Sequence, residues 1–271
     1  MGLLDKLKAI AKYIKYNGNV TQLSICQIYR GGCLQGKKIV VTGGGSGIGL
    51  AMAKKFLSEG AEVVATGRNL EKLKEAESLV NNPKLHILQW DVVRIEEIDE
   101  KLKVAINMLG GIDAFVNNAA FLEHIQTNEE FFDKTLDTNL KAVYFICQKV
   151  VAALITENGE KGGKILNISS INGQMSSIHP YYISKWGVNG LTKGFAKIYA
   201  PKNIIVNAIA PGYCSSSINL QNIEENAYSS KNPIRRIIIP EDIAELAAFL
   251  LSDAANAIVG QIIAVDGGTT L

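Results

Sequence analysis

A tyrosine and a lysine four residues apart, Tyr181 and Lys185, are the side chains of this sequence whose types and spacing best suit acid–base chemistry. Pro180 precedes them, and since proline is favoured in the first turn of a helix, we expect a helix to begin there with both side chains on one face. The pKa of an unperturbed tyrosine is about 10. An ammonium group about 4 Å away, together with the helix dipole, would lower that pKa to about 7, where proton transfer is efficient. A Tyr and a Lys four residues apart on a helix are more often a pair on the protein surface. The serines that precede them and the glycine-rich run near the start of the chain favour the catalytic interpretation.

A glycine-rich run, TGGGSGIG at residues 42–49, lies between an apolar segment and a helical pattern. Glycines let the backbone adopt positive φ and approach a phosphate closely, and a helix N-terminus offers free N–H groups to an anion. The spacing is not G-x-G-x-x-G, and the Lys-Ser/Thr pair of a P-loop is missing, so a nucleoside triphosphate is disfavoured. The run predicts a dinucleotide pyrophosphate site made by Gly43, Gly45, Ser46, Gly47, Ile48 and Gly49.

Short β-branched runs alternate with longer amphipathic stretches from Lys38 onward, which is typical of repeated β-α units. The sequence therefore predicts an α/β fold, a doubly wound parallel sheet of about seven strands in a Rossmann arrangement. The expected strands are Ile39–Thr42, Glu62–Thr66, Leu85–Gln89, Ile112–Val116, Gly163–Ile168, Ile204–Ala208 and Gln261–Val265. The expected helices are about Gly47–Ser58, Leu70–Val80, Glu96–Leu109, Asn128–Glu157, Pro180–Ala200 and Glu241–Leu251.

Composition excludes several other classes of protein. The 271 residues carry a formal net charge of only +2, far less positive charge than nucleic-acid binding usually requires. The four cysteines and three histidines follow no metal-ligand spacing. The start of the chain lacks the apolar core and cleavage site of a signal peptide, and no apolar run approaches the length of a membrane span. We expect a cytoplasmic, metal-free protein.

Further motifs follow the glycine run in a fixed order: Asp91, Asn117-Asn118-Ala119-Ala120, Asn139, Ser169-Ser170, Tyr181-x-x-x-Lys185, Pro211-Gly212 and Asp266-Gly267-Gly268. With the T-G-x-x-x-G-x-G spacing they make residues 37–271 resemble the short-chain dehydrogenase/reductase family. The resemblance implies one Rossmann-type domain, a homodimer or homotetramer, and hydride transfer between NAD(H) or NADP(H) and an alcohol or carbonyl. The nearest resemblance is to 3-oxoacyl-thioester reductases such as those acting on acyl carrier protein.

The resemblance also implies roles for four side chains. Tyr181 is the general acid/base, Lys185 lowers its pKa and holds the nicotinamide ribose, and Ser170 steadies the substrate oxygen. Asn139 bends the long helix and supports a proton relay through a water to Lys185. Ser170 and Tyr181 are eleven residues apart, fewer than the family spacing, so we expect an altered loop between them. Of the neighbouring side chains, Ser169 is expected to support the site, Tyr182 to pack or line the pocket, and His179 to line the pocket or lie in an exposed loop.

Cofactor choice depends on the end of the second strand. An NAD enzyme is expected to place a carboxylate there, but Gly67 occupies that position and Arg68 follows it. Because arginine pairs with phosphate in a forked geometry, we predict NADP(H) rather than NAD(H). The remaining cofactor contacts implied by the resemblance are Asp91 and Val92 at the adenine, Asn118 and Ala119 along the cofactor, and Pro211, Gly212 and Ser216 at the nicotinamide.

Two segments depart from the β-α alternation. Residues 210–239 are rich in serine and asparagine without firm periodicity, and we expect a substrate lid there. Residues 1–36 form an N-terminal extension in which Leu3, Leu4, Leu7, Ile10, Ala11 and Ile14 recur at helical spacing, opposite Lys6, Lys8, Lys12 and Lys15. This amphipathic helix is expected to pack on its own domain or on a neighbouring subunit, with an anionic membrane as the alternative.

The sequence as a whole indicates an enzyme that interconverts a ketone and a secondary alcohol. A non-catalytic nucleotide-binding regulator of the same fold would be expected to lack the Ser–Tyr–Lys set, which is complete here. A membrane-associated reductase recruited by the N-terminal helix is a third possibility. A trans-2-enoyl reductase is disfavoured because such enzymes commonly depart from that set.

Overall fold

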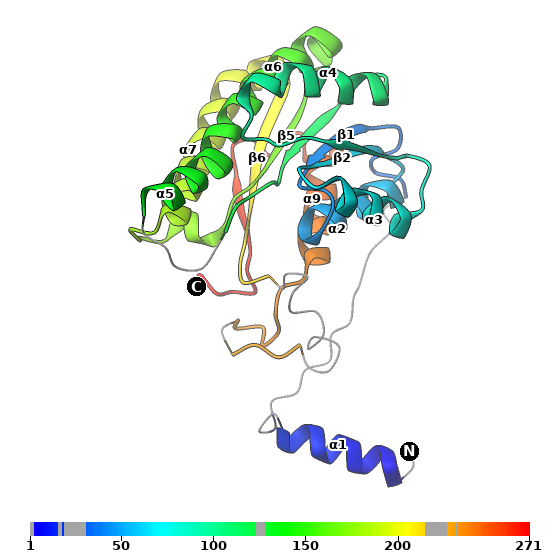
Figure 1. The fold of residues 1–271 in the computed structure, drawn as a ribbon, viewed down its shortest axis with the longest axis vertical. Coiled ribbons are helices and arrows are strands. Elements are labelled where there is room, and N and C mark those ends of the chain that lie inside the picture. The colour runs from blue at the N-terminus through cyan, green and yellow to red at the C-terminus, as the bar shows by residue number, and fades with distance from the viewer. Residues whose placement is uncertain (1–2, 16–17, 19–30, 123–127, 215–226, 231) are drawn as a thin grey trace.

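The computed structural model describes residues 3–15, 18, 31–122, 128–214, 227–230 and 232–271. They contain one parallel sheet of seven strands in the order β3-β2-β1-β4-β5-β6-β7, with helices on both faces (Figure 1). The order reverses between β1 and β4, which is the point at which ligands bind in doubly wound sheets. The predicted fold class is confirmed.

The strands are β1 (Lys38–Thr42), β2 (Glu62–Gly67), β3 (Leu85–Gln89), β4 (Ala114–Asn117), β5 (Gly163–Ile168), β6 (Ile204–Pro211) and β7 (Ile262–Val265). Two of them, β3 and β5, have the predicted bounds. The sixth strand continues three residues beyond its predicted end and pairs with β7 as far as Pro211. All seven carboxyl ends therefore lie along one edge of the sheet, because every pair is parallel.

Helices α2 (Gly47–Ser58), α3 (Leu70–Val80) and α9 (Pro240–Leu251) cover one face of the sheet. The other face is covered by α4 (Ile98–Leu109), α6 (Ala142–Asn158) and α7 (Pro180–Tyr199), with α5 (Glu129–Leu136) beside α7 (Figure 1). Side chains of Asn69 and Asn128 cap α3 and α5, and Pro180 and Pro240 occupy the first turns of α7 and α9. These start signals explain why most helix bounds could be predicted.

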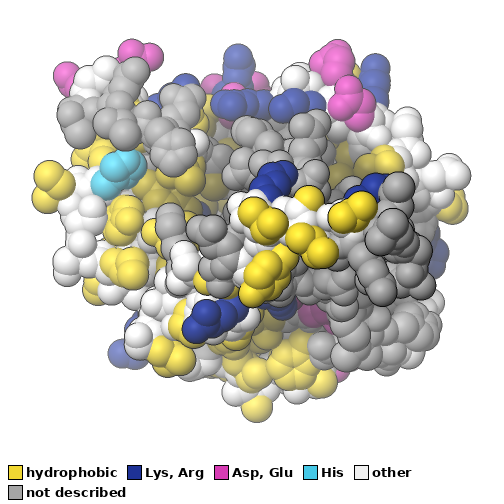
Figure 2. Space-filling model, turned by 90° about the horizontal axis from the view of Figure 1, so that it is seen from below, with side chains coloured by type: hydrophobic (Ala, Val, Ile, Leu, Met, Phe, Trp, Pro, Cys, Tyr) yellow, Lys and Arg dark blue, Asp and Glu magenta, His cyan; other side chains and the backbone are white. Residues whose placement is uncertain are grey.

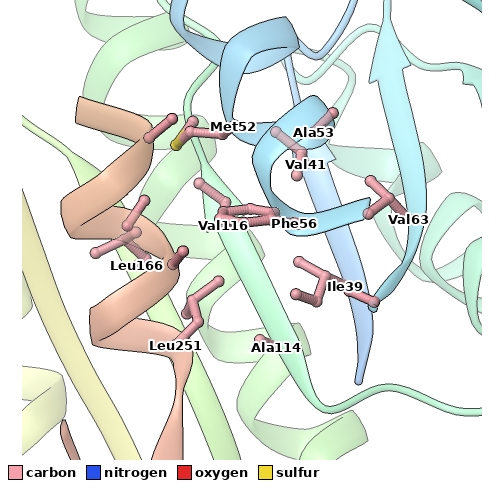
Figure 3. Close-up of a cluster of buried hydrophobic side chains, with 14 of the residues drawn as sticks. Ile39, Val41, Met52, Ala53, Phe56, Val63, Ala114, Val116, Leu166 and Leu251 are labelled. Atoms are coloured by element: carbon pink, nitrogen blue, oxygen red, sulfur yellow. The ribbon is translucent and has the colours of Figure 1, made fainter. Parts of the chain in front are cut away.

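The core has two halves, one on each face of the sheet. Ile39 and Val41 of β1 point into the half shared with α2 and α9, which Figure 3 shows gathered around Phe56 and Met52. Val40 points into the opposite half, together with side chains of α4 and α6. This arrangement accounts for the continuous apolar runs in the sequence, since both faces of a central parallel strand are buried.

The long predicted helix of residues 128–157 is interrupted. Between α5 and α6, residues Asp137–Lys141 form a π-helical turn. The combined segment Glu129–Lys161 is long and apolar enough to cross a membrane by length and composition. Ile146, Val150 and Leu154 of α6 are nevertheless fully buried against the sheet, so this is a core helix of the α/β domain.

The described part of the N-terminal extension begins with α1 (Leu3–Lys15). Its described apolar side chains are exposed, so the expected packing on its own domain is wrong, and packing on a neighbouring subunit stays a prediction. Residues 33–36 behave differently from α1. Leu34 is wholly buried in the core, and its backbone N–H donates to the Glu59 carbonyl.

The expected lid lies only partly within the described residues, since 215–226 and 231 fall outside them. Its described parts are held by two isolated bridges, Cys214 with Ile238 and Tyr228 with Arg236. Ala227 and Ile238 are buried. Both ends of this segment are therefore packed against the domain.

Candidate active site

The glycine-rich run forms the turn between β1 and α2 that the sequence predicts. Gly43 and Gly47 have φ of 65° and 53°, which L side chains rarely adopt. A Cβ on Gly49 would collide with the Gly43 carbonyl oxygen, so α2 approaches the turn as closely as backbone allows. A Cβ on Gly47 would meet nothing within 4 Å, because this glycine faces open space at the helix N-terminus.

Asn118, directly after β4, holds this turn in place. Its Nδ2 donates to the carbonyl oxygens of Thr42 and Gly43 at 2.8 and 3.1 Å. The Thr42 hydroxyl in turn accepts from the backbone N–H groups of Asn118 and Ala119 at 2.9 and 3.1 Å. The ends of β1 and β4 are thus joined at the switch point of the sheet.

A cleft of about 760 Å³ opens above these strand ends. It is lined by Gly43, Gly45, Ser46, Gly47, Ile48, Gly49, Gly67, Arg68, Asn69, Lys72, Leu73, Trp90, Asp91, Val92, Val93, Asn118, Ala119, Ala120, Phe121, Lys134, Thr138 and Cys214. All eleven residues from Gly43 to Ala119 that the sequence assigned to the cofactor line it. Its lining carries three basic side chains and one acidic side chain, which favours an anionic ligand.

The residues that follow β2 form the part of the cleft away from the glycine-rich turn. Arg68 and Lys72 both line it, and the Arg68 carbonyl accepts from Gln89 Nε2 at 3.0 Å. A Cβ on Gly67 would lie 3.6 Å from Leu73, an ordinary contact distance. The absence of a carboxylate at position 67 is therefore not imposed by lack of space for a side chain.

Tyr181 lies in the first turn of α7, where Pro180 places it. The imidazole Nδ1 of His179 accepts the Tyr181 backbone N–H at 3.2 Å and so caps the helix. The His179 ring also packs edge-on against Phe131, with ring centroids 5.6 Å apart. The sequence left the role of His179 open between pocket wall and exposed loop, and the structure shows it as the cap.

The two serines after β5 take different positions. The Ser170 side chain interacts with the Tyr181 side chain, which lowers the pKa of Tyr181, and its hydroxyl accepts the Asn172 backbone N–H at 3.2 Å. The Ser169 hydroxyl points the other way and donates to Asn189 Oδ1 at 2.6 Å. A short 3-10 turn, Ile171–Gln174, takes up the loop before α7, so the short spacing still brings Ser170 to Tyr181.

Lys185 is buried one turn along α7 from Tyr181. Its Nζ donates to the Ile168 carbonyl at 2.8 Å and lies 5.6 Å from the centre of the Tyr181 ring. The ammonium group of Lys185 therefore lies near the Tyr181 ring, as the spacing of the two residues predicted.

The pKa of Tyr181 differs in direction from the sequence expectation. Burial raises it above its usual value, the hydrogen bond with Ser170 lowers it, and Tyr182 raises it further. Burial also lowers the pKa of Lys185 to about 8. The two groups share one buried environment, in which each charged form is disfavoured.

Asn139 lies in the π-helical turn and is fully buried. Its Oδ1 accepts the Phe121 backbone N–H at 2.7 Å and its Nδ2 donates to the Phe121 carbonyl at 2.8 Å. The same Nδ2 lies 3.4 Å from Ser184 Oγ, which donates to the Tyr181 carbonyl. Asn139 thus links a residue of the cleft wall, Phe121, to the turn that carries Tyr181.

The remaining predicted site residues lie outside the lining of the cleft or outside the described residues. Pro211 ends β6 beside Val265 of β7. A Cβ on Gly212 would meet Asp266 Cα at 2.7 Å, so this glycine permits close approach to the Asp266-Gly267-Gly268 turn. Ser216 falls outside the described residues. The cleft lining also includes none of Ser170, Tyr181, Lys185 and Asn139, which are connected to it through Phe121 and the ends of β4 and β5.

Several functional neighbours were missed from the sequence. Lys72 and Lys134 line the cleft from exposed helix positions that carry no motif. Asn189 holds Ser169 and also donates to the Gly173 carbonyl at 2.9 Å. Helical spacing from Lys185 to Asn189 is the one signal that could have indicated Asn189.

The geometry of the cleft fits a nicotinamide dinucleotide. The turn at Gly43 and Gly47 leaves the α2 N-terminus open to an anion, and the cleft is long enough to reach from there to Arg68. The volume lies within the range of pockets that bind cofactors.

The family model described as Enoyl-(Acyl carrier protein) reductase matches residues 43–270. The 3-oxoacyl-[acyl-carrier-protein] reductase of Thermotoga maritima is 36% identical over 250 residues, which cover 88% of this chain and 99% of that protein. The chain belongs to the short-chain dehydrogenase/reductase family. It is therefore an oxidoreductase acting on CH–OH and C=O groups with a nicotinamide cofactor.

Other relatives span more than one named activity. Human dehydrogenase/reductase SDR family member 4 is 34% identical, with 87% of this chain and 88% of that protein covered. The 3beta-hydroxysteroid dehydrogenase 1 of Eggerthella lenta is 35% identical, with 88% and 95% covered. A solved structure from Sinorhizobium meliloti, assigned as a short-chain alcohol dehydrogenase, superposes with a TM-score of 0.78 at 33% identity, covering 87% and 97%.

Proposed function

We propose that this short-chain dehydrogenase/reductase catalyses the NADP(H)-dependent reduction of a 3-oxoacyl thioester to the corresponding secondary alcohol. Support for the substrate class comes from the names of relatives from Thermotoga maritima and Aquifex aeolicus, both 3-oxoacyl-[acyl-carrier-protein] reductases. The observation that carries the reaction type is the contact of Ser170 with Tyr181 beside buried Lys185. The non-catalytic regulator is not favoured, since this set is complete.

In the proposed reaction the chain's own residues bind the carbonyl and supply a proton. Ser170 holds the substrate oxygen next to the Tyr181 hydroxyl. Because the pKa of Tyr181 is raised, the hydroxyl stays protonated at neutral pH, which is the state required of a proton donor. A nicotinamide cofactor held in the cleft would supply the hydride that reduces the carbonyl carbon. Tyr181 then gives its proton to the oxygen, and the product is the alcohol.

Lys185 and Asn139 are proposed to support this step. Lys185 would hold the nicotinamide ribose and stabilise the tyrosinate that remains after proton transfer. Asn139 would support a relay that returns a proton to Tyr181. Its side-chain amide binds the backbone of Phe121 in the cleft wall and also contacts Ser184, whose hydroxyl donates to the Tyr181 carbonyl. Both roles are assigned by the family resemblance and are compatible with these contacts.

Substitution of Tyr181 by phenylalanine tests the acid assignment. Tyr181→Phe removes the hydroxyl and keeps the ring, so we expect kcat to fall by a factor of about 10² to 10⁴. Steady-state kinetics with a 3-oxoacyl thioester measures this fall, while fluorescence titration with NADPH should show unchanged binding. The matched control is Tyr182→Phe, which removes the adjacent hydroxyl and should retain most of the activity. Full activity in Tyr181→Phe would refute the proposal.

NADP(H) is proposed over NAD(H) because the basic side chains of Arg68 and Lys72 line the cleft at the position where an NAD enzyme would place a carboxylate. In this chain that position is occupied by Gly67. Gly67→Asp introduces a carboxylate where a Cβ has room. We expect kcat/KM for NADPH to fall at least tenfold and kcat/KM for NADH to rise, because the carboxylate repels the 2′-phosphate and accepts from a 2′-hydroxyl. An unmodified enzyme that already prefers NADH would contradict this assignment.

A second candidate reaction is the reduction of a trans-2-enoyl thioester, which the description of the matching family model favours. The complete Ser–Tyr–Lys set supports the ketone instead. Assaying 3-oxoacyl and trans-2-enoyl thioesters side by side with each cofactor separates the two reactions. Consumption of the enoyl substrate alone would replace the proposed function.

We also propose a cytoplasmic homo-oligomer, a dimer or tetramer, and a substrate lid at residues 210–239. Support for association comes from large apolar side chains exposed on α7, among them Trp186 and Ile198. Light scattering on the purified protein measures the subunit number, and a monomer at micromolar concentration would contradict the proposal.

A further inference from the structure

Helix α1 has an apolar face that the described part of the chain leaves uncovered. Leu7, Ile10 and Ile14 are spaced three and four residues apart, so they lie on one face of the helix. Their side chains are 56%, 56% and 69% exposed. Three exposed branched aliphatic side chains on thirteen residues form a contiguous apolar stripe, which calls for a partner.

The polar residues of α1 are arranged around this stripe. At 3.6 residues per turn, Lys8 and Lys15 lie roughly 80–100° from Leu7 along one edge of the stripe, and Tyr13 lies beyond the other edge. All three are exposed. The helix contains four lysines and a single acidic residue, Asp5, so it is strongly basic. Lysines beside an apolar stripe extend their charged ends away from it.

The stripe is not used by the α/β domain. Figure 1 shows α1 standing clear of the sheet and its covering helices. Figure 2, which views the molecule from the side on which α1 lies, shows hydrophobic side chains beside basic ones in the middle of that face. The partner of α1 must therefore be outside the described domain.

We propose that α1 binds the surface of an anionic lipid bilayer and holds the reductase there. The apolar stripe would enter the boundary between headgroups and acyl chains, with Lys8 and Lys15 at the phosphates and Tyr13 at the interface. Thirteen residues are too few to span the hydrocarbon core, so α1 lies on the membrane rather than across it. This surface is independent of the proposed substrate and cofactor.

Charge favours a bilayer over a second copy of α1. If two α1 helices paired through their stripes, Lys8 and Lys15 of each would border the contact, and Asp5 is the one acidic residue of the helix that could offset them. Like charges beside an apolar seam oppose association. An anionic surface instead attracts every lysine of the helix, at roughly fivefold in affinity for each.

Sedimentation of the full chain with lipid vesicles tests the proposal. We expect binding to vesicles of mixed phosphatidylcholine and phosphatidylglycerol, little binding to pure phosphatidylcholine, and weaker binding as salt concentration rises. Hydrogen exchange should show the backbone amides of α1 protected by the mixed vesicles. Failure to bind mixed vesicles at low ionic strength would overturn the proposal.

Paired variants identify the surface responsible. Ile14→Glu places a charge on the stripe, and Leu79→Glu makes a similar change at a side chain of α3 with matching exposure, 69% against 67%. We expect at least a tenfold loss of vesicle binding in Ile14→Glu and none in Leu79→Glu. The double variant Lys8→Gln, Lys15→Gln should lose roughly 25-fold.

Circular dichroism and the melting temperature confirm that each variant is folded, since all these side chains are exposed. Equal loss of binding in Leu79→Glu would show that α1 is not the membrane surface. If Ile14→Glu reduces the number of subunits and leaves vesicle binding unchanged, the stripe is a subunit contact and the proposal is wrong.

Discussion

Lys185 keeps an ammonium group where charge is costly. The side chain is fully buried, its described hydrogen bond is to the Ile168 carbonyl, and burial lowers its pKa from 10.5 to about 8. An arrangement that destabilises a charge persists where catalysis requires it. We propose that Lys185 lowers the stability of the fold in order to keep a cation next to Tyr181.

Replacement of Lys185 by methionine should raise the stability of the fold and remove activity. A pKa lowered from 10.5 to about 8 corresponds to a cost of about 3 kcal/mol at neutral pH. Losing the hydrogen bond to Ile168 offsets about 1 kcal/mol of the gain. We therefore expect Lys185→Met to raise the free energy of unfolding by about 1–3 kcal/mol at pH 7 while abolishing activity.

The pH dependence of this difference has a defined sign. Between about pH 8 and 10.5 the unfolded chain binds more protons at Lys185 than the folded chain, so the wild type gains stability as pH rises. The advantage of Lys185→Met should be full below pH 8 and vanish above pH 10.5. Urea unfolding at several pH values measures it, with Lys197→Met, an exposed lysine of α7, as the control. A less stable Lys185→Met at pH 7 would contradict the argument.

The sequence could predict which side chains meet here but not their burial. The four-residue spacing and Pro180 are enough to place Tyr181 and Lys185 on one turn of a helix. The direction of the Tyr181 pKa could not be obtained in this way, because it depends on how much of the surrounding chain excludes water from the ring. Spacing along a helix contains no information about that packing.

At the scale of elements, the start of α7 depends on an unusual cap. Imidazole is a rarer N-cap than Ser, Thr, Asn or Asp, yet His179 Nδ1 accepts the backbone N–H of Tyr181 itself. Its ring is held between Phe131 and Tyr182, with centroids 5.6 and 6.0 Å away. The cap fixes the backbone that carries the Tyr181 ring, and we therefore propose that His179 is a positioning residue.

Removing this cap should affect both stability and turnover. We expect His179→Ala to lower the free energy of unfolding by about 1 kcal/mol and to lower kcat severalfold, with the KM for cofactor unchanged. His179→Asn restores an acceptor and should recover most of both. Asn128→Ala removes the cap of α5, which accepts from Phe131 N–H at 2.9 Å, and should cost similar stability without the same fall in kcat. Equal kcat values in His179→Ala and wild type would exclude the positioning role.

Element boundaries show where sequence patterns fail. Helices α2 and α3 have the predicted bounds because glycine or asparagine marks their starts. The segment 128–157 was predicted as one helix, and the family resemblance implied a bend at Asn139. The apolar periodicity alone does not mark the π-helical turn at Asp137–Lys141, which contains that residue. That turn is stabilised by tertiary contacts of Asn139 with Phe121 and Ser184, which are distant in sequence. Long-range contacts of this kind are invisible in a local pattern.

At the scale of the whole molecule, residues 33–36 of the predicted extension contact the α/β domain. Leu34 is wholly buried among α2 and the sheet, and the Gly36 N–H donates to the Gly60 carbonyl at 3.0 Å. The Cys33 N–H donates to the Glu59 carboxylate at 3.2 Å. We therefore propose that residues 31–36 belong to the catalytic domain and that the separable extension ends before them.

Two truncations test this division of the chain. Removing residues 1–30 should leave the melting temperature and reductase activity unchanged, because α1 is exposed, and should abolish binding to anionic vesicles. Removing residues 1–36 also deletes Leu34, and losing a buried leucine costs about 2–5 kcal/mol, so the melting temperature should fall by several degrees. Leu34→Ala in the full chain should reproduce much of that fall while keeping vesicle binding. If the shorter truncation is as unstable as the longer one, α1 supports the fold, and the separation of membrane contact from catalysis is wrong.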